Sequence, residues 1–232
     1  MNVLVIGAHP DDETIGVGGT ITKHLQNGDE VHIILFSVGH KPIQPKLKEQ
    51  AYEALKVFGI NKNNLYWLNC KSGQFDLDSK LKVNSKLAKL VSKIKPKIVY
   101  THFYGDTHQD HRFVFDSTMV VCRPSHQIRD AKIKNTWSGV EKILCYEIPG
   151  TTNWSGRLNE SFNPTEYNVI SEKHLQKKIQ AYNCYKDEVR LGNHPRSINS
   201  LKTVARFRGN SVSVDFAEAF VLIRNIIHEH QK

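Results

Sequence analysis

Short apolar runs alternate with helical patterns through the first hundred residues, and no other feature constrains the fold of this chain as much. The runs read as buried strands, and between them apolar residues recur every three or four positions. The expected strands are residues 2–7, 30–38, 64–68 and 97–102, and the expected helices are residues 14–27, 45–58 and 78–95. Such alternation implies right-handed crossovers between parallel strands. We therefore predict an α/β fold with a Rossmann-like, mostly parallel sheet and helices on both faces.

The second half of the chain is less regular, but nothing in it marks a second domain. The expected elements are a helix from residue 111 to about 122, an irregular stretch over 123–140, a strand at 142–146, a polar loop over 149–165, helices at 171–186 and 198–208, and a strand or a helix at 217–227. The sequence contains no repeat or low-complexity segment, and 232 residues can bury one substantial core. We therefore expect residues 1–232 to form a single domain.

The composition argues against several classes of protein. The chain has 32 Lys and Arg residues against 23 Asp and Glu residues, a formal net charge of +9. Because the lysines are scattered, without interleaved aromatic residues or a recognisable nucleic-acid module, we expect a solvated basic surface and no nucleic-acid partner. No apolar run approaches the ~20 residues that span a bilayer and no signal peptide is visible, so we expect a cytoplasmic protein without a membrane span. The sequence is compatible with a homo-oligomer.

Two clusters of histidines and carboxylates follow the first and the fourth expected strands. The first cluster is Gly-Ala-His-Pro-Asp-Asp-Glu at residues 7–13, and the second is Asp-Thr-His-Gln-Asp-His at residues 106–111. Ligands of parallel α/β sheets bind at the carboxyl ends of the strands, near the point where the strand order reverses, and both clusters are expected there. Two adjacent carboxylates at a buried strand end repel each other unless a cation compensates them. The sequence therefore predicts one metal centre built from both clusters.

These residue types are the ligands of a catalytic metal site. A catalytic zinc typically has three His or carboxylate ligands and keeps a fourth position open for water. His9, one carboxylate of the pair Asp11 and Asp12, and one histidine of the second cluster would provide the three ligands. Neighbouring side chains of an extended segment point in opposite directions, so the other carboxylate of the pair can reach the water. The same donors also suit Fe²⁺ or another divalent metal ion.

The second cluster offers a choice of histidines. If a helix begins near Asp110, His108 and His111 stand three positions apart, so one can bind the metal while the other faces the substrate. Asp110 or Asp106 could orient the histidine that does not bind the metal and hold it as imidazolium. The role of His102 stays open, because it ends the strand that leads into the cluster.

Three glycines after the first strand suggest a nucleotide-binding turn, but the rest of the pattern argues against it. Gly16, Gly18 and Gly19 do not form the Gly-x-Gly-x-x-Gly turn of dinucleotide-binding folds. Three acidic side chains occupy the place where a pyrophosphate would lie, and they would repel it. We therefore expect no organic cofactor, and we expect the glycines to permit a close approach between the helix and the sheet.

Both clusters resemble the motifs of the LmbE-like family of metal-dependent N-deacetylases, also called the PIG-L family, which includes the N-acetylglucosaminyl-phosphatidylinositol de-N-acetylases. The resemblance is carried by residues 7–19 and 106–111, and more loosely by Arg208-Gly209 and residues 217–220. The first motif is highly specific and the second adds independent support. The resemblance therefore extends over nearly the whole chain.

The resemblance implies a role for each residue of the two clusters. The implied zinc ligands are His9, Asp12 and His111. Asp11 is the implied general base, and His108 is the group that stabilises the oxyanion and protonates the leaving amine. Asp110, which could orient His108, completes the predicted catalytic group.

Two departures from the family pattern concern the substrate. Relatives usually have an arginine at the start of the second helix that holds a sugar hydroxyl, where this chain has Lys48, and many have Asp-Gly after the third strand, where it has Ser72 and a glycine. A lysine is a flexible point charge that suits a phosphate or a carboxylate, so we expect a larger, anionic conjugate to be preferred over free N-acetylglucosamine. Asn153 and Trp154, together with Arg157, lie in a polar loop that could cover the site.

The sequence thus predicts a zinc-dependent hydrolase that removes an N-acetyl group from an amino sugar or a sugar conjugate. The small-molecule substrate is the expected partner. Two alternatives stay open. One is an amidase that acts on another N-acyl conjugate or secondary metabolite, and the other is a non-catalytic protein that binds a metal or a sugar nucleotide.

Overall fold

One mixed β-sheet forms the centre of the part of the chain that the computed structural model describes, which is residues 1–39, 45–124, 137, 139–154, 156 and 160–228. The strand order is β3-β2-β1-β4-β5-β7-β6. The strands are β1 (Asn2–Gly7), β2 (Glu30–Ser37), β3 (Leu65–Cys70), β4 (Ile98–His102), β5 (Lys142–Tyr146), β6 (Glu166–Val169) and β7 (Ala217–Asn225). Strands β1 to β5 are parallel, whereas β7 pairs antiparallel with both β5 and β6. The predicted α/β class and mostly parallel sheet are confirmed.

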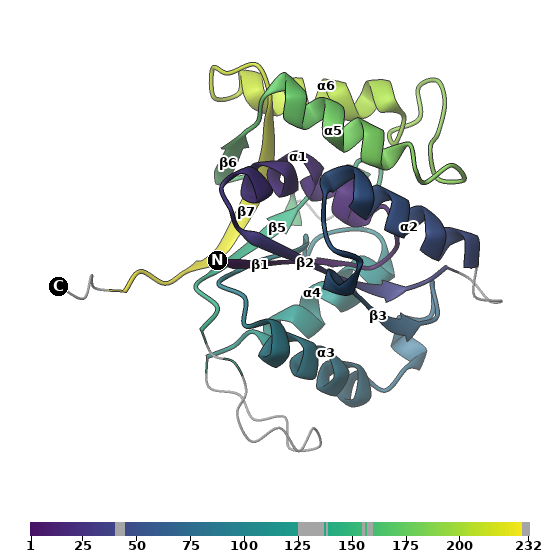
Figure 1. The fold of residues 1–232 in the computed structure, drawn as a ribbon, viewed down its shortest axis with the longest axis vertical. Helices are drawn as coiled ribbons and strands as arrows, with labels where there is room; N and C mark the ends of the chain where they lie inside the picture. Colours follow the sequence, from purple (N-terminus) through teal and green to yellow (C-terminus); the bar gives the residue numbers. More distant parts are fainter. Residues whose placement is uncertain (40–44, 125–136, 138, 155, 157–159, 229–232) are drawn as a thin grey trace.

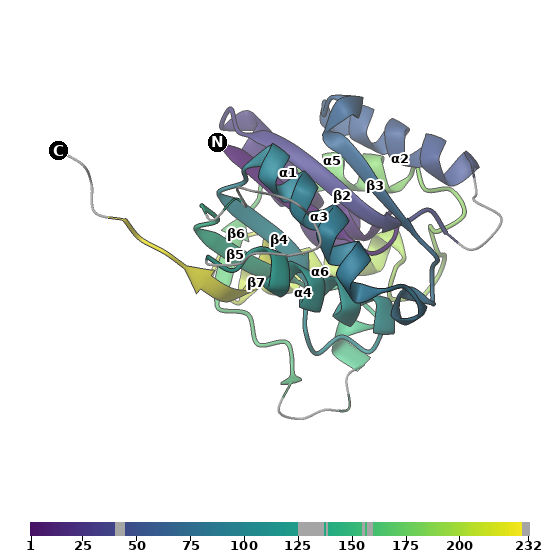
Figure 2. The same ribbon diagram turned by 90° about the horizontal axis from the view of Figure 1, so that it is seen from below.

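Helices cover both faces of this sheet (Figure 1). The helices are α1 (Asp12–Gln26), α2 (Pro45–Phe58), α3 (Lys80–Ile94), α4 (Gln109–Val121), α5 (Glu172–Tyr182) and α6 (Ile198–Asn210). Helices α1, α2, α5 and α6 lie on one face, and α3 and α4 lie on the other, where the turned view of Figure 2 shows them in front of the strands. Short 3₁₀ turns occur at Lys62–Asn64, Phe75–Leu77 and Thr152–Trp154. Within the described residues, no helix combines the length and the apolar composition needed to cross a membrane.

The central strand β1 separates two hydrophobic cores. Val3 and Val5 pack into the core shared with α1, α2, α5 and α6, while Leu4 and Ile6 pack into the core beneath α3 and α4. All four side chains are fully buried. Burial on both faces explains why β1 is a continuous apolar run rather than an alternating one.

The glycines of α1 let the helix approach its neighbours closely. A Cβ atom at Gly16 would collide with the ring of Tyr146 on β5. A Cβ atom at Gly19 would lie 2.7 Å from Ile170 Cδ1, which is closer than real Cβ contacts. The predicted close approach between helix and sheet is therefore present at Gly16, where α1 packs against β5.

The strand order places the two clusters together. The chain passes from β1 outward to β2 and β3, and then returns through α3 to β4 on the other side of β1. The carboxyl ends of β1 and β4 therefore lie side by side at a topological switch point. This is the position that the alternation of strands and helices predicts for a ligand site.

In the second half of the chain, the structure departs from some of the expectations and decides one that was open. Residues 166–169 form the short strand β6, which was not expected. Residues 217–225, for which a strand and a helix were both open, form β7 because this segment pairs with β5 on one side and β6 on the other. Helix α5 ends at residue 182 rather than 186. Most of the stretch 123–140 lies outside the described residues.

Candidate active site

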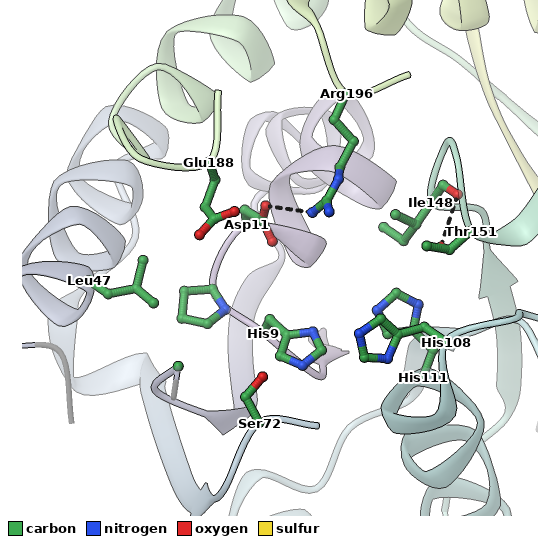
Figure 3. A pocket seen from close by; sticks show the side chains of 12 residues that line it. His9, Asp11, Leu47, Ser72, His108, His111, Ile148, Thr151, Glu188 and Arg196 are labelled. Carbon is green, nitrogen blue, oxygen red and sulfur yellow. Dashed lines mark hydrogen bonds and ion pairs between the residues drawn. The ribbon is translucent and has the colours of Figure 1, made fainter. Parts of the chain in front are cut away.

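Asp11 has the most unusual backbone of the site. It lies between β1 and α1 with φ 117° and ψ −30°, a conformation that costs a non-glycine residue on the order of 1–3 kcal/mol. It occupies the N-cap position of α1, yet its side chain makes no capping hydrogen bond. The carboxylate instead lines a pocket above the carboxyl ends of the strands (Figure 3). The strained backbone therefore aims the Asp11 carboxylate into this pocket.

Asp12, the next residue, has polar neighbours at both of its carboxylate oxygens. The His9 backbone amide donates to Asp12 Oδ2 over 2.8 Å, and His102 Nε2 lies 3.2 Å from the same oxygen. His111 Nε2 lies 3.6 Å from Asp12 Oδ1. Asp12 is only 1% exposed. Its carboxylate is thus the centre on which histidines from the β1 end, β4 and α4 converge.

His9 and His111 share one arrangement of their two ring nitrogens. His9 Nε2 lies 2.9 Å from Asp110 Oδ2, and its Nδ1 lies 3.4 Å from Asp12. His111 Nδ1 lies 3.2 Å from Asp106 Oδ2, and its Nε2 faces Asp12. Each ring therefore has one nitrogen beside an outer carboxylate and the other beside Asp12. Metal-binding histidines typically have this pattern, because the outer carboxylate fixes the tautomer and the ring orientation.

His102 differs from these two histidines. It is fully buried and stacks on His111, with ring centroids 3.9 Å apart. Its Nε2 lies 3.0 Å from the Ala8 amide nitrogen, and its buried Nδ1 has no hydrogen-bond partner among the described residues. His102 therefore supports the ring of His111 and contacts Asp12, but it lacks an outer carboxylate of its own.

His108 caps helix α4 with its ring. Its Nδ1 accepts a hydrogen bond from the Asp110 amide over 3.2 Å, and its own amide donates to Asp106 Oδ1 over 2.8 Å. The expectation that Asp110 or Asp106 orients the ring of His108 needs correction, because the two carboxylates lie beside His9 and His111 instead. The Asp110 carboxylate is also held by the Gly73 amide at 2.6 Å. The ring orientation of His108 is therefore set by the cap of α4.

The donor atoms of the cluster fit a divalent metal ion. Two overlapping groups place their ligand atoms within 4.8 Å of one another, one made of His9, His108 and His111 and the other of Asp12, His102 and His111. The predicted ligands draw on both groups, since His9 belongs to the first, Asp12 to the second and His111 to both. Imidazole and carboxylate donors suit Zn²⁺ and Fe²⁺.

Burial and charge push the pKa values of the two neighbouring carboxyls apart. Burial raises the pKa of Asp11 well above its usual range, and the charge of Asp12 adds to this effect. Burial also opposes the ionisation of Asp12, but the charges of His111 and His102 outweigh it and hold the pKa of Asp12 well below its usual range. Pairs of groups with opposite shifts are typical of catalytic sites. A nearby cation would favour the ionised form of Asp11 as well.

The histidines are shifted in opposite directions. Burial lowers the pKa of His9, but its hydrogen bonds to Asp110 and Asp12 outweigh this effect and raise the pKa to about 10. Burial and the charge of His102 lower the pKa of His111 to about 4. Burial and the charge of His9 lower the pKa of His108, so that this ring favours the neutral form rather than the predicted imidazolium.

A pocket of about 190 Å³ lies over this cluster. Its lining residues among the described part of the chain are His9, Pro10, Asp11, Gly39, Leu47, Ser72, His108, His111, Ile148, Thr151, Glu188 and Arg196. Of the four predicted substrate residues, only Ser72 is in this lining. Lys48 instead places its Nζ over the ring of Trp67, 5.4 Å from the centroid. Asn153 accepts a hydrogen bond from the Gly150 amide, Trp154 is 80% exposed, and Arg157 lies outside the described residues.

Glu188 and Arg196 were not anticipated from the sequence. Both belong to the connection between α5 and α6, and they flank Asp11 in the pocket (Figure 3). Arg196 Nη1 lies 3.5 Å from Asp11 Oδ2. A single Glu and a single Arg in a connection form no motif, so only the fold reveals that they meet the first cluster.

Comparison with known proteins identifies relatives of the chain. Residues 4–122, more than half of the chain, match the family model described as PIG-L: GlcNAc-PI de-N-acetylase, and this match includes both clusters. The protein named Uncharacterized deacetylase YaiS of Escherichia coli strain K12 is 28% identical over 194 residues. That alignment covers 79% of this chain and 90% of YaiS.

Two solved structures share the fold. N,N'-diacetylchitobiose deacetylase from Pyrococcus horikoshii has a TM-score of 0.76 at 22% identity, over 96% of this chain and 84% of its own. GalB, the 4-carboxy-2-hydroxymuconate hydratase from Pseudomonas putida KT2440, has a TM-score of 0.75 at 16% identity, over 100% of this chain and 99% of its own. Because a deacetylase and a hydratase share the fold, these similarities establish the fold alone, and the reaction must be argued from the site.

Proposed function

Because this chain belongs to the PIG-L family, we propose that it is a divalent-metal-dependent N-deacetylase that removes the acetyl group from an amino sugar or a sugar conjugate. One observation carries the proposal. Asp12 is surrounded by histidines, while the adjacent Asp11 faces the pocket from a strained backbone without a capping role. Such a division between two neighbouring carboxylates suits one metal ligand and one general base.

The proposed metal ligands are His9, Asp12 and His111. The outer carboxylates Asp110 and Asp106 support this choice over His102, because each lies beside a nitrogen of one proposed ligand. A divalent ion held there would polarise the amide carbonyl and make a bound water more acidic. We propose Zn²⁺ as the ion, with Fe²⁺ as the alternative that the same donors accept.

Asp11 is the proposed general base. Its carboxylate lines the pocket, is 2% exposed, and can accept the proton of the attacking water while Asp12 stays with the metal. Burial and Asp12 favour a proton on Asp11, and Arg196 opposes them. A base of this kind takes up a proton readily and can release it later in the cycle.

His108 is the proposed donor to the amide oxygen, while the leaving nitrogen takes its proton from Asp11 rather than from His108. Its Nδ1 accepts the Asp110 amide hydrogen, which leaves the proton of the neutral ring on Nε2. His108 also lines the pocket, so an Nε2–H group is available to the developing oxyanion. As the bond between carbon and nitrogen breaks, the proton that Asp11 accepted from the water passes to the amine, the His108 ring stays neutral, and the products are acetate and a free amine.

The test is the release of free amine from N-acetylated sugars by metal-loaded protein. The panel contains N-acetylglucosamine, N,N'-diacetylchitobiose, and neutral and anionic glycosides of N-acetylglucosamine. We expect turnover of at least one member, with loss of turnover after chelation and recovery on adding Zn²⁺ or Fe²⁺. Turnover that survives complete removal of metal would contradict the proposed metal dependence. No amine release from any member by fully loaded protein would contradict the substrate class.

A further inference from the structure

The wall of the pocket opposite the histidines carries a hydrogen-bond donor and an acceptor. Arg196 and Glu188 both line the pocket and stand on either side of Asp11 (Figure 3). They come from the connection that joins the end of α5 to the start of α6. Neither residue contacts the three proposed metal ligands directly among the interactions of the described residues, so both are available to the rest of the substrate.

A single buried hydroxyl fixes the backbone of both residues. Tyr182 is fully buried, and its hydroxyl lies 3.0 Å from the Glu188 carbonyl oxygen and 2.9 Å from the Arg196 carbonyl oxygen. A β-bridge between Arg190 and Ser197 draws the two ends of the segment together. The connection therefore presents Glu188 and Arg196 in a fixed relation, as a preorganised binding site requires.

The connection between α5 and α6 is also linked by hydrogen bonds to the motif that contains Asp11. Tyr185 donates a hydrogen bond to Glu13 Oε1 over 2.6 Å, and Glu13 Oε2 accepts from the Asp11 amide over 3.2 Å. Tyr185 and Glu13 are both fully buried. The position of the opposite wall is therefore set relative to Asp11, the proposed general base.

Most of the hydrogen-bonding capacity of the two side chains is uncommitted. A guanidinium has five N–H donors, and among the described residues that of Arg196 makes one contact, at 3.5 Å to Asp11. Glu188 pairs with Arg190 at 3.5 Å through Oε2 alone. Arg196 therefore has donors, and Glu188 an acceptor, to offer to a molecule in the pocket.

The charges on this wall favour a neutral ligand. The positive charge of Arg196 faces the carboxylates of Asp11 and Glu188, so the wall offers an anion no excess of positive charge. Lys48, which had suggested an anionic substrate, lies over Trp67 and outside the pocket lining. A donor and an acceptor that flank Asp11 can bind two neighbouring hydroxyls of a sugar ring, one hydroxyl accepting and the other donating.

We propose that Arg196 and Glu188 are specificity-determining residues that bind two neighbouring hydroxyls of a neutral sugar ring, with Arg196 donating to one and Glu188 accepting from the other. This inference rests on the proposed deacetylase function and narrows its substrate class. It also supplies, from a different segment, the donor and acceptor that are missing at Lys48 and Ser72. Tyr182 acts as a positioning residue for the pair.

The experiment measures each variant on the parent sugar and on analogues that lack one hydroxyl. Using N-acetylglucosamine, or the glycoside that the amine-release panel favours, kcat/KM is measured for the parent sugar and for analogues that lack one ring hydroxyl. Hydrogen bonds to charged groups support losses of about 10- to 100-fold. We expect Glu188→Gln to cost about this much on the parent sugar and almost nothing further on the analogue that lacks its partner hydroxyl. Arg196→Met should show the same non-additive loss in KM with the neighbouring hydroxyl, and it should also lower kcat on every substrate because its charge beside Asp11 is lost.

Controls separate binding from folding and from chemistry. Glu53→Gln on α2 and Arg224→Met on β7 change exposed side chains of the same types. They should leave the ratio of kcat/KM between the parent sugar and each deoxy analogue unchanged. Tyr182→Phe should raise KM for the parent sugar more than it lowers kcat, because it loosens the wall and leaves the metal site intact. Thermal unfolding of each variant identifies a loss that comes from instability.

The possible outcomes distinguish this inference from the proposed function. If the loss of kcat/KM caused by the variant and the loss caused by removing the hydroxyl simply add, the two groups do not interact. This result would overturn the paired-hydroxyl inference, while the proposed deacetylation would stand. A tenfold or greater preference for anionic over neutral sugars that disappears in Arg196→Met would replace it with anion binding. If the wild-type protein releases no amine, calorimetric Kd values for the same sugars still test the inference. It then stands only if the same non-additive losses appear in binding.

Discussion

The two walls of the pocket are held in place by different means. On the histidine wall, Asp12, His111 and the outer carboxylate Asp106 are at most 2% exposed, and each touches a residue from another element. On the opposite wall, the side chain of Arg196 is 29% exposed, and its only ion pair among the described residues is a long one to Asp11. Rigidity on that wall comes instead from its backbone, through Tyr182.

This difference indicates which wall can change without loss of the reaction. Removing a side chain from the histidine wall leaves buried charges without partners, so this wall tolerates little substitution. On the opposite wall, Arg196 and Glu188 can be exchanged while the anchoring hydroxyl stays. We infer that the histidine wall holds the metal, that Asp11 lies between the two walls, and that Arg196 and Glu188 on the opposite wall select the substrate. The predictions below test this division.

The largest effect is expected from His111→Ala. This change removes a proposed metal ligand that is also stacked on His102, so most of the metal should be lost and turnover should fall to background. Elemental analysis and amine release check the two consequences. His32→Ala, which changes a buried histidine of β2 outside the cluster, is the matched control and should keep its metal. Full occupancy in His111→Ala would remove His111 from the ligand set.

His108→Ala is expected to lower kcat by about 10²- to 10³-fold with the metal retained, because it removes the proposed donor to the oxyanion. The same change removes the cap of α4, which typically costs about 1 kcal/mol of stability. His108→Asn separates the two effects, since asparagine is a good cap but offers no imidazole proton. We expect Asn to restore the unfolding temperature and leave kcat low. Recovery of kcat in His108→Asn would show that only the cap matters.

Metal affinity should rise with pH, because the metal needs the neutral form of His9. In the metal-free protein the pKa of His9 is about 10, so each pH unit below that value should weaken binding about tenfold for this one proton. At pH values below about 6.5, the ordinary pKa of histidine, the charged ring of His9 contributes its full stabilisation to the metal-free protein. This stabilisation is lost as the pH rises through about 10, the pKa of His9 in the folded protein. Asp110→Asn should lower the pKa of His9. The pH dependence of metal affinity and the loss of stability of the metal-free protein should then both move to lower pH. Competition titrations with a chelator from pH 6 to 9 measure the effect, and a flat profile would contradict it.

The smallest effect is expected from Lys48→Met. The Lys48 ammonium group lies over Trp67 rather than in the pocket lining, so kcat/KM should stay within about twofold of the wild-type value. Arg196→Met, the matched change on the opposite wall, should raise KM and also lower kcat, because it removes the positive charge beside Asp11. If Lys48→Met impaired an anionic substrate and Arg196→Met did not, the original expectation for Lys48 would be restored.

Much of the histidine wall could be predicted because its residues are local in sequence. Strands β1 and β4 are apolar runs, and the clusters follow them within a few residues, so strand order alone brings His9 and His111 together. The predicted family and fold class are confirmed. The contacts of Asp110 with His9 could not be predicted, because they depend on how the first turn of α4 is oriented.

Other features depend on packing between distant segments. The four residues of β6 are too few for a strand pattern, and they form a strand because β7 offers them a partner. The stacking of His102 on His111 requires the spacing between β4 and α4. Arg196 meets Asp11 across 185 positions of sequence, and no local pattern marks such a pair.

Asp11 and Asp12 are adjacent carboxylates with separate proposed roles, and one paired measurement tests this separation. Metal content and amine release are determined side by side for Asp11→Asn and Asp12→Asn, with thermal unfolding as the check on folding. We expect Asp11→Asn to keep its metal and to lose about 10²- to 10⁴-fold in kcat, as is typical of a general base, while Asp12→Asn loses metal and activity together. Loss of metal in Asp11→Asn with retention in Asp12→Asn would mean that the two roles are exchanged.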